Sequence, residues 1–242
     1  MSGKDEAGLS MVDTRYFDLQ SVFDADGGPG VLGKVASQLM ELHQRVRHLD
    51  APVVLECGVN EGWSTGVLAH ALEINGGKLI SLDIEDCSDA IVSDCWTFLQ
   101  TDDTEQEYIL RQAPILKSGI DLIYIDSLHA AKHVARLLEL WYPLVKQGGW
   151  LAFDDVDPGP YLCGQRKDDA NREVAWRAIS RVVMDFFYAN EDDLLLEIHY
   201  GSTGLALMKK LAPMAKSPKP VRRIPRRRVT LRSIARYLAR RA

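Results

Sequence analysis

The stretch VVLECGVNEGWS at residues 53–64 decides the fold that this sequence predicts. Its first residues form a short apolar run, which is typical of a buried strand, and Gly58 and Gly62 mark a turn directly after it. Glycines let the backbone pass close to a ligand, and a helix after the turn presents unpaired N–H groups to an anion. The spacing is E-x-G-x-x-x-G, and Asn60 stands where the nicotinamide-type fingerprint requires glycine. A strand-to-helix turn without a ligand would use the same residues.

Short apolar runs alternate with longer amphipathic segments along most of the chain. Strands alternating with helices predict a doubly wound α/β fold, in which helices cover both faces of a mostly parallel sheet. A final antiparallel hairpin is expected around residues 201–203. The expected strands cover residues 53–55, 78–82, 96–100, 122–125, 150–153, 194–200 and 204–208, and the expected helices cover residues 31–49, 64–72, 106–113, 130–145 and 172–188. Ligands of such sheets bind beyond the carboxyl ends of the strands.

Acidic side chains follow the expected second and third strands. Asp83 ends the second strand, where a carboxylate can accept hydrogen bonds from both hydroxyls of a ribose. Asp102 and Asp103 follow the third strand and are candidates to contact the amino group of an adenine. Capping of loops and helices would explain all three residues equally well when each is taken alone. Together with the glycine turn, they favour a cofactor that contains adenosine.

Three more carboxylates follow the fourth and fifth strands, namely Asp126, Asp154 and Asp155. If these strands are neighbours, the carboxylates converge at one edge and need a counter-charge, because each raises the pKa of the others. Oxygen ligands favour a hard divalent cation, Mg²⁺ first and Mn²⁺ or Ca²⁺ next. His129 is a candidate general base or substrate contact, whereas His133 is expected to be an ordinary helix residue. Strand-end capping by backbone N–H groups is the alternative for the carboxylates.

The charge of the chain is divided unevenly. The 242 residues carry a net charge of -5, but residues 209–242 contain 13 Lys and Arg and no Asp or Glu. We expect three parts: an N-terminal extension with a helix (1–50), the α/β domain (51–210) and a basic tail (211–242). The tail has the pattern of a basic amphipathic helix and suits an anionic membrane, a nucleic acid, an acidic partner or the acidic body itself. A flexible solubilising tail is an equally good interpretation.

The composition indicates a globular protein of a reducing compartment. Apolar residues make up 46% of the chain, and the four cysteines form no CxxC pair. Residues 1–26 lack the basic and then apolar start of a secretory signal, so a cytoplasmic location is expected.

These segments together resemble the class I S-adenosylmethionine-dependent methyltransferases. The turn at Glu56, Gly58 and Gly62 is similar to their cofactor signature, and Asp83 to their ribose-binding acid. The stretches YIDSLH (124–129) and LVKQGGWLAFDD (144–155) are similar to the metal-dependent O-methyltransferases, which include catechol-type enzymes and the branch that acts on sugar hydroxyls of macrolides and aminocoumarins. That branch usually has I-D-G-x-H-x-Y, whereas this chain has Ser127 at the glycine position and Ala131 at the tyrosine position.

The resemblance covers roughly residues 52–209 and implies a seven-stranded sheet whose last strand is antiparallel. It implies S-adenosyl-L-methionine and Mg²⁺ or another divalent cation as cofactors, and a hydroxylated small molecule such as a sugar or phenol as the acceptor. The relatives commonly self-associate, so a homo-oligomer is a further expectation. Carried over to this chain, the metal ligands are Asp126, Asp154 and Asp155, and Ser64 falls where the family contacts the methionine carboxylate.

Two other interpretations belong to different functional classes. The first is a protein of the same fold that binds the cofactor without catalysis, against which the retention of all three candidate metal ligands argues. The second is a relative of an oxygenase-labelled branch that shares the acidic pattern. Carboxylates without a pair of histidines do not suit Fe(II) chemistry, so the methyltransferase remains the favoured interpretation.

Overall fold

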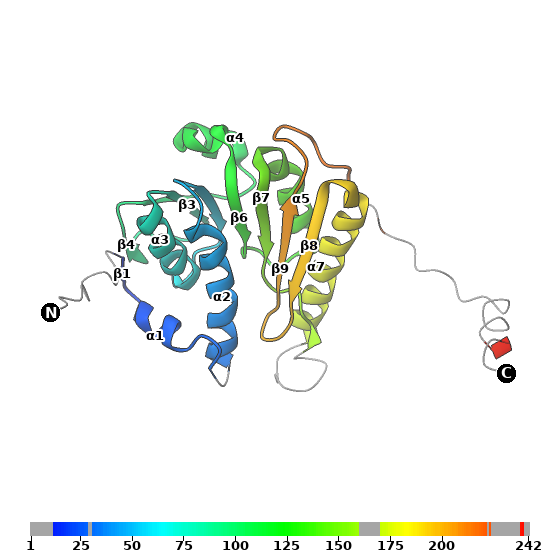
Figure 1. The fold of residues 1–242 in the computed structure, drawn as a ribbon, viewed down its shortest axis with the longest axis horizontal. Coiled ribbons are helices and arrows are strands. Elements are labelled where there is room, and N and C mark those ends of the chain that lie inside the picture. The colour runs from blue at the N-terminus through cyan, green and yellow to red at the C-terminus, as the bar shows by residue number, and fades with distance from the viewer. Residues whose placement is uncertain (1–11, 29–30, 160–169, 222, 224–237, 240–242) are drawn as a thin grey trace.

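A seven-stranded sheet forms the centre of the computed structural model, which describes residues 12–28, 31–159, 170–221, 223 and 238–239 (Figure 1). The strands lie in the order β5-β3-β2-β6-β7-β9-β8. Their bounds are Val53–Cys57 (β2), Lys78–Asp83 (β3), Trp96–Gln100 (β5), Ile120–Ile125 (β6), Val145–Phe153 (β7), Leu194–His199 (β8) and Leu205–Lys210 (β9). The first five strands are mutually parallel, and β9 runs antiparallel to both β7 and β8. The predicted fold, mostly parallel with an antiparallel last strand, is therefore confirmed.

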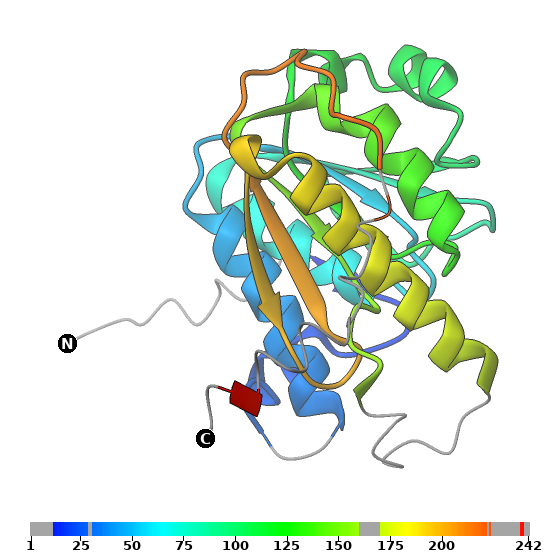
Figure 2. The ribbon, with the colours of Figure 1, turned by 90° about the vertical axis from the view of Figure 1, so that its right-hand side faces the viewer.

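Helices cover both faces of this sheet, and each face has its own hydrophobic core. On one face lie α1 (Leu19–Asp24), α2 (Val31–Arg47) and α3 (Trp63–Asn75), and on the other lie α4 (Gln106–Gln112), α5 (Ala131–Trp141) and α7 (Ala170–Ala189). Figure 2 shows α5 and α7 side by side on the second face. Short 3-10 helices cover Pro114–Ser118, Tyr142–Leu144 and Glu191–Asp193. The two layers bury all of β2 and all of β6 except the half-buried Asp121, which explains why these strands are mostly apolar.

The predicted end of one helix and the predicted start of the strand after it are wrong. The helix expected over residues 130–145 ends at Trp141, and β7 begins at Val145, five residues before the expected start at residue 150. Pro143 lies in the 3-10 turn between them. The helix ends before it because proline cannot continue the hydrogen bonding of an α-helix. The first half of β7 contains Gly148 and Gly149. Glycines are weak strand formers, so the sequence pattern does not predict a strand there.

The N-terminal segment contains structure that the sequence did not predict. Helix α1 and the two-residue strand β1 (Asp13–Thr14) precede α2, and β1 pairs antiparallel with β4 (Ile91–Val92). Phe17 stacks on Trp63 at the start of α3, with ring centroids 4.7 Å apart. This segment therefore packs against the helix that follows the glycine turn.

Two expectations fall partly outside the described residues. The predicted amphipathic helix of the tail is one. The other is a substrate lid over residues 156–172, which follow the acidic cluster and are rich in proline, glycine and charged residues. In the part of the chain that the structure describes, no helix combines the length and the apolar character that a membrane span requires.

Candidate active site

A cavity of about 750 Å³ opens at the carboxyl ends of the parallel strands. Residues after β2, β3, β5, β6 and β7 line it, together with Trp176 from α7 and Thr203 from the turn between β8 and β9. Parallel strands end at the same edge of a sheet, so segments far apart in the sequence meet here. The cavity is of the size that binds a cofactor or a drug-sized ligand.

The glycine turn forms one wall of this cavity. Its first glycine, Gly58, is required by a close contact within the protein. Gly58 has a φ of +97°, and a Cβ at this position would lie 2.2 Å from the carbonyl oxygen of Asp126. Gly62 also has a positive φ, of +82°, where it caps the start of α3. Gly58 and Asn60 line the cavity. The close approach that requires glycine at position 58 is thus between β2 and β6, and a ligand is not needed to explain it.

Asp83 holds the glycine turn from the end of β3. Its Oδ2 accepts hydrogen bonds from the backbone N–H groups of Val59 (2.8 Å) and Asn60 (3.2 Å), and its Oδ1 accepts one from Glu85 (3.0 Å). Asn60 needs this support because its φ of +49° is uncommon for a residue other than glycine. Asp83 also lines the cavity, where its carboxylate keeps accepting capacity for a ligand.

Glu56 and Ser64, both predicted to bind the cofactor, lie behind the turn. Glu56 is fully buried and accepts hydrogen bonds from the hydroxyls of Ser64 (2.5 Å), Thr65 (2.8 Å) and Ser81 (2.6 Å). Burial raises the pKa of Glu56 to about 7, and the three hydroxyls oppose this rise. These contacts join β2, β3 and α3, so the pair holds the turn in place from within the protein.

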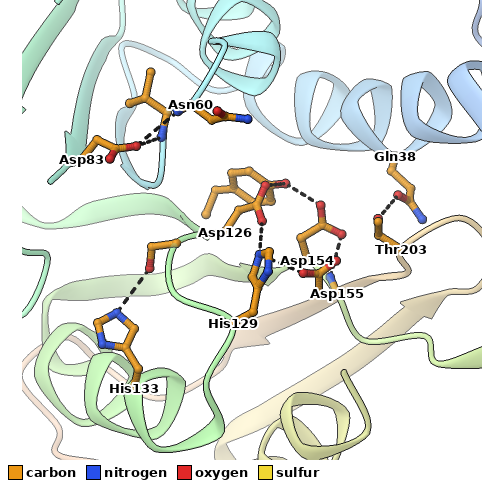
Figure 3. Close-up of polar contacts among 12 residues, drawn as sticks. Gln38, Asn60, Asp83, Asp126, His129, His133, Asp154, Asp155 and Thr203 are labelled. Carbon is orange, nitrogen blue, oxygen red and sulfur yellow. Dashed lines mark hydrogen bonds and ion pairs between the residues drawn. The ribbon is translucent and has the colours of Figure 1, made fainter. Parts of the chain in front are cut away.

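The three carboxylates predicted to bind a metal converge beside His129 (Figure 3). Tyr124 lies between two of them, with its hydroxyl 3.1 Å from Asp126 Oδ2 and 3.2 Å from Asp154 Oδ2. Asp154 Oδ1 accepts the backbone N–H of Asp155 at 2.7 Å. Asp155 has a φ of +59°, and such strained residues cluster at functional sites. The strand ends therefore place acidic oxygens together, as the sequence predicted.

His129 supplies a positive charge beside this cluster. Its Nε2 lies 2.8 Å from Asp155 Oδ2 and 3.4 Å from Asp126 Oδ1. Hydrogen bonds to Asp126 and Asp155 raise the pKa of His129 to about 10. Burial and the charge of Asp126 raise the pKa of Asp154 to about 7, and burial also raises the pKa of Asp126. Carboxylates crowded in this way are stabilised by a cation, and His129 takes that place within the chain itself.

The donor set fits a divalent cation. One oxygen each of Asp126 and Asp155, together with the ring nitrogen of His129, lie within 4.8 Å of one another. Asp154 borders the same group through Tyr124. Carboxylate oxygens are the ligands that Mg²⁺ and Mn²⁺ prefer, and several of them around one ion relieve their mutual repulsion.

Asp102 and Asp103 line the cavity after β5, but both carboxylates already accept hydrogen bonds. Asp102 is exposed and accepts from the backbone and hydroxyl of Thr104, at 2.8 and 2.6 Å. Asp103 is only 6% exposed and accepts from Ser127 and from His133. The interpretation of His133 as an ordinary helix residue is therefore wrong, because its ring contacts a buried carboxylate of the cavity wall.

Four other residues at the site could not be recognised from the sequence. Tyr124 points from within β6, where a tyrosine reads as part of a strand, and Trp176 reads as part of a helical pattern. Thr203 lies in the hairpin turn, and its hydroxyl donates to Gln38 Oε1 of α2 at 3.1 Å (Figure 3). Gln38 also donates to the carbonyl of Gly201 at 2.7 Å. These contacts join segments that are more than 160 residues apart, so no local pattern reveals them.

Comparisons with known proteins agree with this geometry. Residues 55–156 match a family model described as "Methyltransferase domain". A solved structure of MycE, a methyltransferase from the mycinamycin biosynthetic pathway in complex with Mg and S-adenosylhomocysteine (SAH), matches with a TM-score of 0.54 and 20% identity. The match covers 81% of this chain and 55% of MycE, so the chain spans just over half the length of that protein.

Two further solved structures resemble the chain over most of their own length. The O-methyltransferase TomG from Streptomyces achromogenes, in complex with SAM, has 17% identity and a TM-score of 0.51, with 82% of this chain and 92% of TomG covered. The SAH-bound methyltransferase PaMTH1 from Podospora anserina has 14% identity and a TM-score of 0.52, with 79% and 85% covered. The comparison with curated proteins gives no match. The chain therefore has the fold of these methyltransferases, and its residues 55–156 match the methyltransferase family model.

Proposed function

We propose that this protein is an S-adenosylmethionine-dependent O-methyltransferase that uses a divalent cation, Mg²⁺ first, and methylates a hydroxyl of a small molecule or sugar. One observation carries the proposal: Asp126, Asp154 and Asp155 converge in a cavity that is also lined by the glycine turn held by Asp83. The complex of MycE with Mg, SAH and mycinamycin VI lends support from a protein of similar fold.

The cavity suits the cofactor in size and in the groups that it presents. Gly58, Asn60, Asp83, Asp102 and Asp103 border it and remain the candidate cofactor contacts. The other predicted residues would not contact the cofactor but would hold the turn and the start of α3 in position, namely Glu56, Gly62 and Ser64. The carboxylate of Asp83 accepts hydrogen bonds and so suits the hydroxyls of a ribose.

The carboxylates of Asp126, Asp154 and Asp155 would hold the cation. When bound, the cation lowers the pKa of an acceptor hydroxyl, and S-adenosylmethionine supplies the methyl group from its sulfonium. Tyr124 orients two of these carboxylates, because its hydroxyl lies between Asp126 and Asp154. Alignment of the hydroxyl with the methyl group is then the main requirement for transfer.

His129 is the favoured acceptor for the proton of the hydroxyl, and a carboxylate of the cluster is the alternative. Half of the His129 side chain is exposed, and it lines the cavity beside the acidic cluster. The hydrogen bonds to Asp126 and Asp155 that raise its pKa are the contacts that a cation among these carboxylates would weaken. The Nε2 atom of His129 would then be able to take a proton.

The test is methyl transfer from labelled S-adenosylmethionine to a panel of sugar and phenol acceptors, with excess chelator and then with added Mg²⁺. We expect activity that depends on the cation and that Asp154→Ala abolishes, while calorimetry gives nearly unchanged SAH affinity. Asp94→Ala, at an exposed aspartate distant from the cavity lining, is the matched control. Full activity in excess chelator, with Asp154→Ala also active, would refute the role of the cation.

A further inference from the structure

A hydrogen-bonded group of three side chains, Asp103, Ser127 and His133, forms part of the cavity wall. The Ser127 hydroxyl donates to Asp103 Oδ2 at 2.6 Å, and His133 Nε2 lies 2.9 Å from Asp103 Oδ1. Ser127 Oγ and His133 Nε2 are 3.3 Å apart. The three residues come from the segment after β5, the segment after β6 and helix α5. The backbone of Asp103 is fixed as well, because Trp141 Nε1 donates to its carbonyl at 3.0 Å.

The direction of the protons follows from the donors and acceptors in this group. An ionised carboxylate only accepts hydrogen bonds, and a serine hydroxyl has one proton and two lone pairs. Asp103 receives the protons of both Ser127 Oγ and His133 Nε2. Toward a ligand in the cavity, Ser127 Oγ can therefore only accept a hydrogen bond. At this point, Ser127 suits a ligand group that donates a hydrogen bond and opposes one that only accepts.

The position of Ser127 indicates which part of the cofactor lies nearby. Ile84 follows Asp83, and both Ile84 and Leu128 line the cavity with large exposed apolar side chains, 68% and 61% exposed. Exposed apolar side chains within a binding cavity suit the faces of a flat ring. Leu128 is the direct neighbour of Ser127 in the sequence. With the ribose at Asp83, the adenine ring would extend toward Ile84, Leu128 and Ser127.

We propose that Ser127 Oγ accepts a hydrogen bond from the 6-amino group of the adenine, and that Asp103 and His133 hold the hydroxyl in this accepting orientation. The inference rests on the proposed function, since it takes S-adenosylmethionine as the cofactor. The residue that contacts the amino group is then Ser127, in place of Asp102 or Asp103, which the sequence suggested. It also explains why Asp103 is bonded within the protein. Ser127 then distinguishes a 6-amino purine from a 6-oxo purine.

The experiment compares two ligands by calorimetry on the full chain: SAH and S-inosylhomocysteine, in which an oxo group replaces the 6-amino group. We expect the wild-type protein to bind SAH at least about tenfold more tightly, because a site that pairs a donor rejects an analogue without it. In Ser127→Ala this preference is expected to fall to about twofold, since one hydrogen bond is worth roughly that difference. Asp102→Asn tests the competing contact to the amino group and should keep the preference if Ser127 is the acceptor. The matched control is Asp94→Asn, at an exposed aspartate outside the cavity lining, which should behave as the wild type.

A second variant tests the orientation of the same hydroxyl by changing Asp103, the residue that accepts its proton. In Asp103→Asn, the amide oxygen can accept from His133 while the amide nitrogen donates to Ser127 Oγ. The hydroxyl proton of Ser127 is then free to face the cavity, so the preference for SAH should fall at least about fivefold, as expected for the loss of a hydrogen bond. This result does not depend on how well Ser127→Ala folds.

The outcomes separate this inference from the proposed function. An unchanged preference in Ser127→Ala and Asp103→Asn, or a preference lost in Asp102→Asn instead, would overturn the role of Ser127 while leaving the cofactor in place. A wild-type protein that binds neither compound would overturn the proposed cofactor and this inference together. Chelator-insensitive SAH binding with the expected preference would support Ser127 whatever the metal does.

Discussion

Replacing Glu56 by glutamine tests how the turn after β2 is held. Glu56 is fully buried and accepts three hydroxyl hydrogen bonds, and burial raises its pKa from 4.5 to about 7. Between these two values the folded protein binds more protons than the unfolded protein, so the free energy of unfolding decreases as the pH rises. This rise in the pKa of Glu56 corresponds to roughly 3 kcal/mol of stability, which is fully present below pH 4.5 and lost above about pH 7. Glutamine does not ionise and removes this dependence.

The assay is urea unfolding of wild type and Glu56→Gln at about pH 4 and about pH 8, the two sides of the titration window. Other buried acids, such as Asp154, contribute equally to both proteins and cancel in the difference. Wild type should lose about 2–3 kcal/mol relative to the variant between the two pH values. Glu107→Gln, at an exposed residue of α4, is the control and should track the wild type. A wild-type-minus-variant difference that is the same at both pH values would refute the burial of an ionisable Glu56.

Three further changes test other parts of the account. Gly76→Ala, at a φ of +73° with open space around it, should cost about 1 kcal/mol in urea unfolding, whereas Gly58→Ala should cost about 3 kcal/mol or more, because its Cβ would meet a backbone oxygen. Burial beside His70 lowers the pKa of His43 to about 4, so acid should destabilise the fold as the pH falls from 6.5 to about 4, and thermal melts of His43→Gln should show a weaker dependence. Asp154→Asn should weaken Mn²⁺ binding, measured by titration, at least about tenfold, and unchanged affinity would contradict its place among the ligands.

Much of the fold could be predicted from the sequence because the central strands are buried on both faces. Such strands are continuous apolar runs, as in β2 and β6, and their ends are marked by polar residues. The start of β7 could not be predicted in this way, because it contains two glycines and its residues 146–148 are exposed or half-buried. Helix α1 is only six residues long and has too few turns for a periodic pattern.

Some residues of the candidate site could also be predicted from the sequence, whereas others could not. Each of the four aspartates lies at the carboxyl end of a parallel strand, so the topology alone brings them to one edge. Asp83 ends β3, Asp126 follows β6, and Asp154 and Asp155 follow β7. The sequence could not predict their partners, because contacts such as Ser127 with Asp103 depend on how separate segments pack. For the same reason, Glu56 was predicted to contact the cofactor, whereas its depth behind the turn becomes visible only in three dimensions.

The most direct test of the account is a crystal structure of the whole chain grown with Mg²⁺ and SAH. We expect one cation bound by the carboxylates of Asp126, Asp154 and Asp155, next to the sulfur of an SAH molecule whose ribose contacts Asp83. Density for SAH in the cavity, with these three carboxylates free of any cation at saturating Mg²⁺, would contradict the metal-assisted mechanism. A cavity without SAH would contradict the assignment of the cofactor.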